Sequence, residues 1–319
     1  MNGEFKMNEL NLVKETTEKI INEMEKRIIG NRNQIKLILI TLFAKGHVLL
    51  EGVPGIAKSY LASTLSDVLG MDHKRIQFTP DLMPADITGS SIYNPKDLKF
   101  EFIPGPIFTN IVLCDEISRA PPKTQAALLE SMQELQVTVE GITRKLDRPF
   151  FVMATQNPIE QVGVYPLPEA QLDRFMIRLM MSLPNYEEEV NILRSKRANF
   201  IPKVNVVSSR DEIIAIQKVL DKVDISDSIL DYIARLVVKT RFLPALALGG
   251  SPRASIALMT MCRAKAAMEG RSYVEPDDVK YLFFHVMNHR IILTPQAEVD
   301  QVPIQQIVDS VIKETPVNL

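Results

Sequence analysis

The chain has 319 residues, 46% of them hydrophobic, with 37 Lys and Arg against 39 Asp and Glu and a formal net charge of −2. This length is enough for a sizeable core and for two domains, and the lack of a basic excess argues against a dedicated duplex-DNA binder. The two cysteines, Cys114 and Cys262, have no paired spacing, which argues against a disulfide framework or a cysteine zinc site.

Secretion and membrane signals are missing from the sequence. The N-terminal residues MNGEFKMNEL contain no apolar core of a signal peptide. The longest apolar stretch, residues 35–50, is interrupted by Lys36, Lys45 and His47, so it does not predict a membrane span. We therefore expect a soluble, cytoplasmic protein.

The first 183 residues predict an α/β domain. Apolar residues recur at helical spacing over residues 10–28 and 33–45, and Gly30 and Gly46 follow as stops. Short apolar runs then alternate with helical segments, which indicates a parallel sheet flanked by helices. The expected strands are HVLLE (47–51), RIQF (75–78), IVLCD (111–115), PFFVMA (149–154) and FMIRLMM (175–181).

Two segments interrupt this alternation. Residues 91–103 hold the turn signal Asn94-Pro95 between two β-prone runs, and residues 135–146 hold Glu140-Gly141 between two more. Both patterns predict β-hairpins inserted into the α/β core.

After Pro184 the pattern becomes helical. Ser251-Pro252 is an N-cap residue followed by proline at the first helical position. We therefore predict two domains, a P-loop core over 1–183 and a small helical domain over 184–319. The expected helices cover residues 186–198, 211–221, 226–240, 252–268 and 276–288.

A phosphate-binding loop is predicted between the first strand and the helix after it. The glycines let several backbone N–H groups point into one concavity, and the helix N-terminus favours an anion. Lys58 would reach the β- and γ-phosphates, and the Ser59 hydroxyl would bind Mg²⁺. Ala57 replaces the usual glycine before the lysine, and a strand–helix turn with a chance lysine is the alternative. The predicted ATP-binding segment comprises Gly52, Val53, Pro54, Gly55, Ile56, Ala57, Lys58, Ser59 and Tyr60.

An acidic pair, Asp115-Glu116, ends the strand IVLCD. A buried carboxylate is costly unless it is paired or binds a metal. Asp115 is therefore expected to hold Mg²⁺, and Glu116 to orient and deprotonate the attacking water. An ordinary solvated strand end is the alternative, but the phosphate loop about 60 residues earlier favours the nucleotide site.

Three further residues are candidates for catalysis. Asn157 closes an apolar strand, where its amide can hold water or the γ-phosphate, although Asn-Pro also starts turns. Arg174 suits the charge on a transferring phosphoryl group, with a structural ion pair as the alternative. Arg253 lies in the first turn of a helix, where the dipole disfavours a cation, so a functional role is favoured over a surface arginine.

Together these motifs resemble the MoxR branch of the AAA+ ATPases. The most specific stretches are GVPGIAKS, DEISRAPPKTQAALLESMQE, ATQNPIEQVGVYPLPEAQLDRF and GGSPRA. The family usually has threonine at the position of Ser59, and either hydroxyl can bind magnesium. The resemblance assigns Walker A to Lys58 and Ser59, and Walker B to Asp115 and Glu116.

The same resemblance implies further roles. Asn157 would be the first sensor, Arg174 the arginine finger, and Arg253 the second sensor in a lid domain. The segment Ile28, Ile29 and Gly30 would line the adenine pocket. Proteins of this type form rings, usually hexamers, in which the finger acts on the neighbour's ATP.

The client and partner classes follow from the family alone. The resemblance implies a chaperone-like ATPase that remodels client proteins or inserts metal cofactors, with a partner bearing a von Willebrand factor A domain. A metal-chelatase motor subunit, a nucleic-acid-dependent motor and a nucleotide-gated scaffold without turnover stay as alternatives. The neutral charge argues against nucleic acid, and the complete set of Glu116, Asn157 and Arg174 argues against the scaffold.

Overall fold

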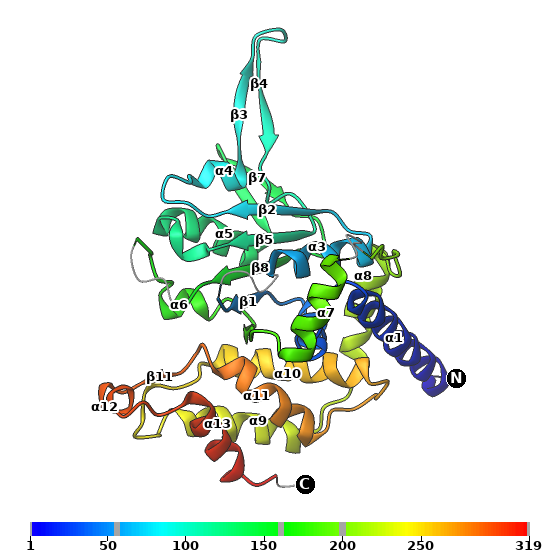
Figure 1. Cartoon of the computed structure of the whole chain (residues 1–319), viewed down its shortest axis with the longest axis vertical. Helices are drawn as coiled ribbons and strands as arrows, with labels where there is room; N and C mark the ends of the chain where they lie inside the picture. Colours follow the sequence, from blue (N-terminus) through cyan, green and yellow to red (C-terminus); the bar gives the residue numbers. More distant parts are fainter. Residues whose placement is uncertain (1, 54–57, 159–162, 198–201, 318–319) are drawn as a thin grey trace.

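The computed structural model of the chain describes residues 2–53, 58–158, 163–197 and 202–317. Figure 1 shows an α/β body from which a long hairpin projects, with a layer of helices against the opposite side of the sheet. Within these ranges, no helix is long and apolar enough to cross a membrane.

The α/β body is built on a five-stranded sheet in the order β2-β5-β8-β1-β9, and every neighbouring pair is parallel. This confirms the predicted parallel sheet, and β5 coincides with the predicted IVLCD. The other strands shift by at most two residues at their ends. The bounds are β1 Val48–Glu51, β2 His73–Gln77, β5 Ile111–Asp115, β8 Phe151–Gln156 and β9 Ile177–Met180.

Side chains of the central strands alternate between two hydrophobic clusters. In β1, Val48 and Leu50 face one cluster and Leu49 the other, and in β5, Leu113 and Cys114 divide in the same way. Both faces of the sheet are therefore covered, which explains why these strands are apolar throughout. The helices of this body are α1 Asn2–Glu25, α2 Arg32–Phe43, α3 Lys58–Leu69, α4 Pro84–Thr88, η1 Ile117–Arg119, α5 Pro122–Glu134 and α6 Glu169–Leu172.

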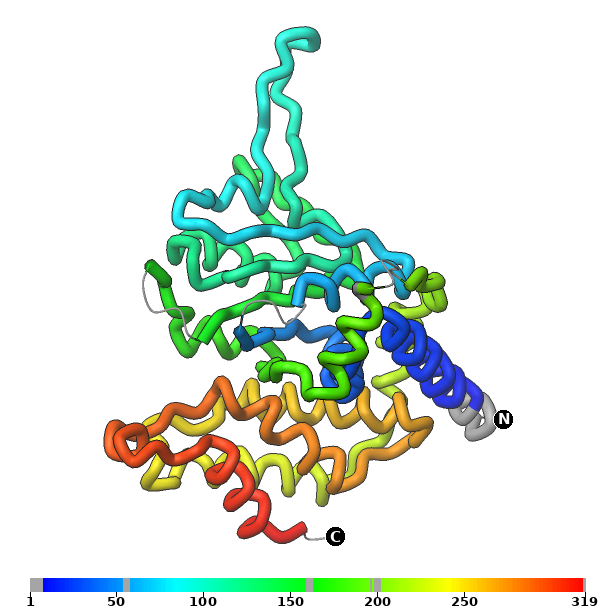
Figure 2. Tube along the Cα trace, in the orientation of Figure 1, coloured from blue at the N-terminus to red at the C-terminus, as the bar shows by residue number. Residues whose placement is uncertain are grey.

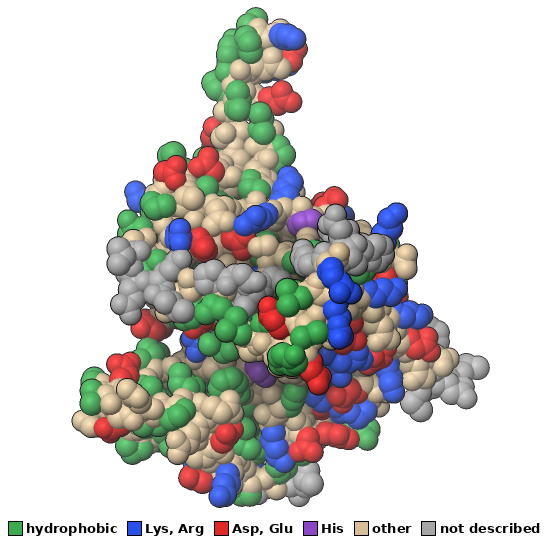
Figure 3. Space-filling view, in the orientation of Figure 1, with side chains coloured by type: hydrophobic (Ala, Val, Ile, Leu, Met, Phe, Trp, Pro, Cys, Tyr) green, Lys and Arg blue, Asp and Glu red, His purple; other side chains and the backbone are tan. Residues whose placement is uncertain are grey.

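Both predicted hairpins are present. One joins β3 Gly89–Asn94 to β4 Lys99–Pro104, and the other joins β6 Gln136–Val139 to β7 Ile142–Lys145. The β3–β4 hairpin stands clear of the body in Figures 1 and 2. Several of its apolar side chains are exposed, with Leu98 and Phe100 both at 73%, and Figure 3 shows hydrophobic side chains together with charged ones at the tip.

The region after β9 is helical, as predicted, but it contains a small sheet and short helices that the sequence did not predict. A two-stranded antiparallel sheet, β10 Leu246–Leu248 with β11 Ile292–Leu293, joins two of its loops. Such short strands and the short helix α12 leave no periodic pattern in the sequence. The prediction also missed α13 Ile304–Lys313, although its buried residues Ile307, Val308 and Val311 recur at helical spacing. The helices are α7 Tyr186–Arg197, α8 Arg210–Val219, η2 Leu220–Lys222, α9 Asp227–Thr240, α10 Pro252–Met268, α11 Pro276–Met287, α12 Pro295–Val299 and α13 Ile304–Lys313.

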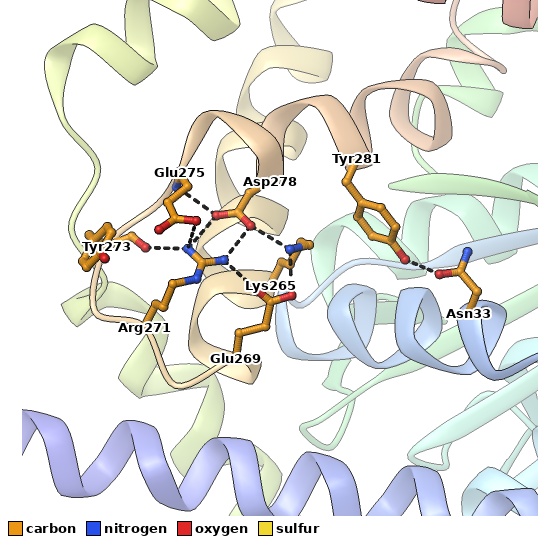
Figure 4. Close-up of polar contacts among 8 residues, drawn as sticks. All are labelled: Asn33, Lys265, Glu269, Arg271, Tyr273, Glu275, Asp278 and Tyr281. Atoms are coloured by element: carbon orange, nitrogen blue, oxygen red, sulfur yellow. Dashed lines mark hydrogen bonds and ion pairs between the residues drawn. The ribbon is translucent and has the colours of Figure 1, made fainter. Parts of the chain in front are cut away.

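A polar cluster fastens α10 to α11 (Figure 4). The Asp278 side chain, 1% exposed, accepts hydrogen bonds from Lys265 Nζ at 2.8 Å, from both Arg271 terminal nitrogens at 2.9 and 2.6 Å, and from the Glu275 N–H at 2.9 Å. In the same view, Tyr281 of α11 donates to Asn33 of α2. The helical region is therefore tied to the α/β body at α2.

Candidate functional site

The carboxyl ends of β1, β5 and β8 lie side by side at one edge of the sheet, where ligands of open α/β folds bind. Glu51 at the end of β1 is in register with Gln156 at the end of β8. Lys58 begins α3 directly beyond this edge, and Asp115 ends β5 at it.

Lys58 connects the two sides of the predicted phosphate loop. Its Nζ donates to the carbonyl oxygen of Gly52 at 2.7 Å and to that of Gln156 at 3.3 Å, and the Gly52 N–H also donates to Gln156. The next residues, Ser59 and Tyr60, continue α3. Four residues of the predicted loop, Pro54, Gly55, Ile56 and Ala57, lie outside the described residues, whereas Val53 is half-buried.

Asp115 is the centre of a buried polar contact network. Its Oδ2 accepts from the Ser59 hydroxyl at 3.0 Å and from Arg75 Nε at 2.6 Å, and its Oδ1 accepts from the Thr155 hydroxyl at 3.4 Å. A hydroxyl and a carboxylate in contact are the oxygen donors that Mg²⁺ prefers. Ser59 and Asp115 therefore fit the magnesium role that the sequence assigned to them.

Glu116 has a backbone conformation that is rare for its type. Its φ of 57° lies in the left-handed region, and its N–H donates to the Thr155 hydroxyl at 2.9 Å. Its Oε2 accepts from Gln77 Nε2 at 3.0 Å and pairs with Arg119 Nε at 3.0 Å. The turn thus directs the carboxylate next to Asp115, toward side chains of β2 and η1.

Both candidate arginines are connected to Asp173, since Arg174 is the next residue in the chain and Arg253 forms an ion pair with its side chain. Arg174 donates to the Leu129 carbonyl in α5 at 3.0 Å, and its buried Nε has no hydrogen-bond partner among the described residues. Arg253, in the first turn of α10, lies 3.8 Å from Asp173 Oδ2. Asn157, by contrast, directly follows Gln156 at the phosphate-loop edge and is half-buried.

Sequence reasoning missed a cluster that joins the end of α11 to the residues around Arg174. Arg290 donates to Asp173 Oδ1 at 2.6 Å and to the carbonyls of Phe175 and Met176, and His289 Nε2 contacts the Phe175 carbonyl at 3.0 Å. These partners are more than 110 residues apart, so no local pattern could have revealed them. Burial lowers the pKa of Arg290 and outweighs the opposite effect of Asp173.

A second connection reaches the residue before the phosphate loop. Arg178 of β9 pairs with Glu51 at 3.2 Å and donates to Asn288, which returns a hydrogen bond to the Arg178 carbonyl. The helical region therefore contacts both the segment that carries Arg174 and the strand that leads into the loop.

A cavity of about 250 Å³ adjoins the predicted adenine segment. Ile28 is buried in the core, and Gly30 has a φ of 72° and faces the Glu188 side chain, 2.3 Å from where a Cβ would stand. Asn31, the residue after Gly30, lines the cavity. Its lining is Asn31, Gln34, Ser182, Leu183, Pro184, Asn185 and Glu188.

Two protein-family models match parts of this chain. Residues 47–177 match the model of the "ATPase family associated with various cellular activities (AAA)", and residues 238–311 match the AAA lid domain. A crystal structure of a candidate ATPase from Cytophaga hutchinsonii, 38% identical, superposes over 100% of both chains with a TM-score of 0.94.

Two relatives are similar along nearly the whole chain. The uncharacterized protein YeaC of Bacillus subtilis is 47% identical over 300 residues, covering 94% of each chain. The chaperone MoxR1 of Mycobacterium tuberculosis is 40% identical over 307 residues, covering 93% of this chain and 81% of its own. The chain therefore belongs to the MoxR family of AAA+ ATPases.

Proposed function

We propose that this chain binds MgATP at the edge formed by β1, β5 and β8 and hydrolyses it to ADP and phosphate. The observation that carries the proposal is the 3.0 Å contact between the Ser59 hydroxyl and the Asp115 carboxylate, with Glu116 directed beside it by a left-handed turn. Lys58 at the start of α3 adds the positive charge that a phosphate requires.

Each residue has a distinct task in this proposal. Lys58 binds the β- and γ-phosphates, and Ser59 and Asp115 hold Mg²⁺, which neutralises charge on the phosphate oxygens when bound. Glu116 orients the attacking water and takes its proton. Asn157 fixes that water or the γ-phosphate. The cavity beside Ile28, Ile29 and Gly30 receives the adenine.

The two arginines extend the proposal to an assembly. Arg174 acts on the ATP of the neighbouring subunit in a homo-oligomeric ring, usually a hexamer in this family. Arg253 reports the nucleotide state to the helical region. The exposed apolar β3–β4 hairpin transmits the motion to a protein client.

The physiological task is proposed from the relatives. The name of the chaperone MoxR1 supports remodelling of proteins. Insertion of a metal cofactor, a cytoplasmic location and a partner with a von Willebrand factor A domain are proposed from the family resemblance alone. Partner pulldown separates this task from that of a metal-chelatase motor subunit. Stimulation of turnover by DNA or RNA would instead favour a nucleic-acid motor.

The deciding experiment measures ATP turnover per subunit as protein concentration rises, at saturating Mg²⁺. We expect specific activity to rise steeply and Arg174→Ala to lower it by roughly 10³-fold or more, because the finger completes the neighbour's site. Arg194→Ala, an exposed arginine of α7, is the matched control. Flat specific activity with an active Arg174→Ala variant would mean that each subunit hydrolyses ATP alone.

A further inference from the structure

Two side chains of β2 hold the two acidic residues at the end of β5. β2 is the edge strand of the sheet, and Arg75 and Gln77 lie on its exposed face, on either side of the buried Ile76. The parallel register places Gln77 opposite Asp115. From there Arg75 reaches Asp115 and Gln77 reaches Glu116, and the two are joined by a hydrogen bond of 3.2 Å from the Arg75 guanidinium to Gln77 Oε1.

Arg75 uses the same carboxylate oxygen as Ser59. Asp115 Oδ2 accepts from the Ser59 hydroxyl at 3.0 Å and from Arg75 Nε at 2.6 Å. A carboxylate oxygen offers about two lone-pair positions. A cation bound between Ser59 and this oxygen takes the lone-pair position that the Ser59 hydroxyl now uses. The Arg75 guanidinium holds the other position on the same oxygen, so the cation shares that oxygen with Arg75 and meets its like charge.

The exposures of the two side chains decide which one moves. The Arg75 side chain is 58% exposed, whereas the Asp115 side chain is 9% exposed. A guanidinium that is already half in water can turn outward at little cost, because exposed ion pairs are weak. The Asp115 carboxylate is enclosed by Ser59 and Thr155 and stays in place.

We propose that Arg75 is a positioning residue that competes with magnesium for Asp115, so that metal binding displaces the guanidinium from this carboxylate. The proposal rests on the ATP site described above and adds a regulation to it. Arg75 neutralises the charge of Asp115 until the metal arrives, and displacement also frees Gln77, the partner of Glu116, from its contact with Arg75. Metal binding at Asp115 is thereby linked to Gln77, the side chain that donates to the proposed base Glu116.

The test compares Arg75→Gln with Lys74→Gln. Lys74 is the exposed neighbour on the same strand, so its replacement removes an equal charge without touching the Asp115 contact. Each protein is titrated with Mn²⁺, with the free ion followed by electron paramagnetic resonance, both saturated with ADP and without nucleotide. We expect Arg75→Gln to bind the ion about threefold more tightly, as an exposed pair allows, and Lys74→Gln to match the unchanged chain.

Each other outcome contradicts the competition. Weaker binding in Arg75→Gln would mean that the arginine supports the metal site, and equal tightening in both variants would show a general charge effect without the contact. No change in either variant would show that Arg75 and the ion do not compete. ADP binding in the presence of EDTA is measured first and tests the proposed nucleotide site without the metal. If ADP does not bind, the proposed function fails, and the Mn²⁺ titration without nucleotide still decides whether Arg75 and the ion compete.

Discussion

At the scale of single residues, Thr155 organises both acidic side chains of the site. Its hydroxyl donates to Asp115 Oδ1 and accepts the Glu116 N–H, and it is 1% exposed. A buried hydroxyl that both donates and accepts is satisfied in one orientation only. Thr155 of β8 therefore fixes the turn at the end of β5 and sets the direction of Glu116.

Replacement of Glu116 by glutamine tests the role of its charge. Glutamine keeps the shape and can still accept from Gln77, but it cannot take a proton from water. We expect ATP to bind with similar affinity and turnover to fall by roughly 10²–10⁴-fold. Binding of a fluorescent nucleotide and single-turnover hydrolysis separate the two effects. Normal turnover in this variant would remove Glu116 from the mechanism.

At the scale of elements, Asp173 joins the α10 N-terminus to the segment that carries Arg174. Ser251 is the N-cap residue of α10, yet its hydroxyl makes no cap bond in its own helix and donates instead to Asp173 Oδ2 at 3.1 Å. The carboxylate also lies where the helix dipole favours an anion. A shift of α10 would therefore act on Asp173, and Arg174 is the next residue in the chain.

Asp173 pairs with two arginines, which offers a matched comparison. Arg290 has a side chain 3% exposed and lies 2.6 Å away, whereas Arg253 is 56% exposed and lies 3.8 Å away. We expect Arg290→Ala to lower the free energy of unfolding by about 3–5 kcal/mol, because it leaves Asp173 Oδ1 and several carbonyls without their donor, and the Asp173 side chain is only 15% exposed. Arg253→Ala should cost about 0–1 kcal/mol.

Urea unfolding of both variants checks this difference. Equal losses in the two variants would contradict the conclusion that Arg290, and not Arg253, anchors the helical region to the α/β body. The same pair of variants separates stability from function, since Arg253 is proposed to act on the nucleotide.

At the scale of the whole molecule, one hydrophobic cluster runs from the sheet into the helical region. It includes Val48 and Leu50 of β1, Ile38 of α2, and Leu258 and Met261 of α10. The helical region therefore shares a core with one face of the sheet, and the polar contacts at Asp173 and Arg178 mark the edge of that core. Movements between the two parts would have to repack this shared surface.

Buried histidines predict how stability depends on pH. Burial lowers the pKa of His47 and of His285 to about 4, and it lowers the pKa of His289 well below its usual value. The unfolded chain binds protons near pH 6.5 whereas the folded chain does not. The contribution of these neutral histidines to the free energy of unfolding is therefore fully present above about pH 6.5 and is lost as the pH decreases toward 4. The loss from His47 alone is about 3 kcal/mol.

Urea midpoints at pH 7.5, 6.0 and 5.0 measure this slope. The buried His47 ring accepts from the Val152 N–H and contacts the Met132 carbonyl. His47→Gln should make stability depend less on pH, because glutamine binds no proton in either the folded or the unfolded chain. A stability that stays constant from pH 7.5 to 5.0 would contradict the prediction.

The sequence by itself determined the elements and the residues with strong local signals. The parallel strands, both hairpins and most helices of the helical region follow from hydrophobic period and turn residues, and β5 has the predicted bounds. The positions of Lys58, Ser59 and Asp115 at one edge also follow, because each lies at the end of a predicted strand or the start of the helix after it. These properties depend on neighbours in the chain, which sequence patterns record.

Only the tertiary structure decided how distant side chains meet. The sheet order places β2 beside β5, so that Arg75 contacts Asp115 across 40 residues, and the docking of α11 places Arg290 against Asp173 across 117 residues. Such pairs leave no periodic trace, because hydrogen bonds and ion pairs require only that two side chains meet in space. The site that the sequence predicted therefore gained its positioning residues only from the fold.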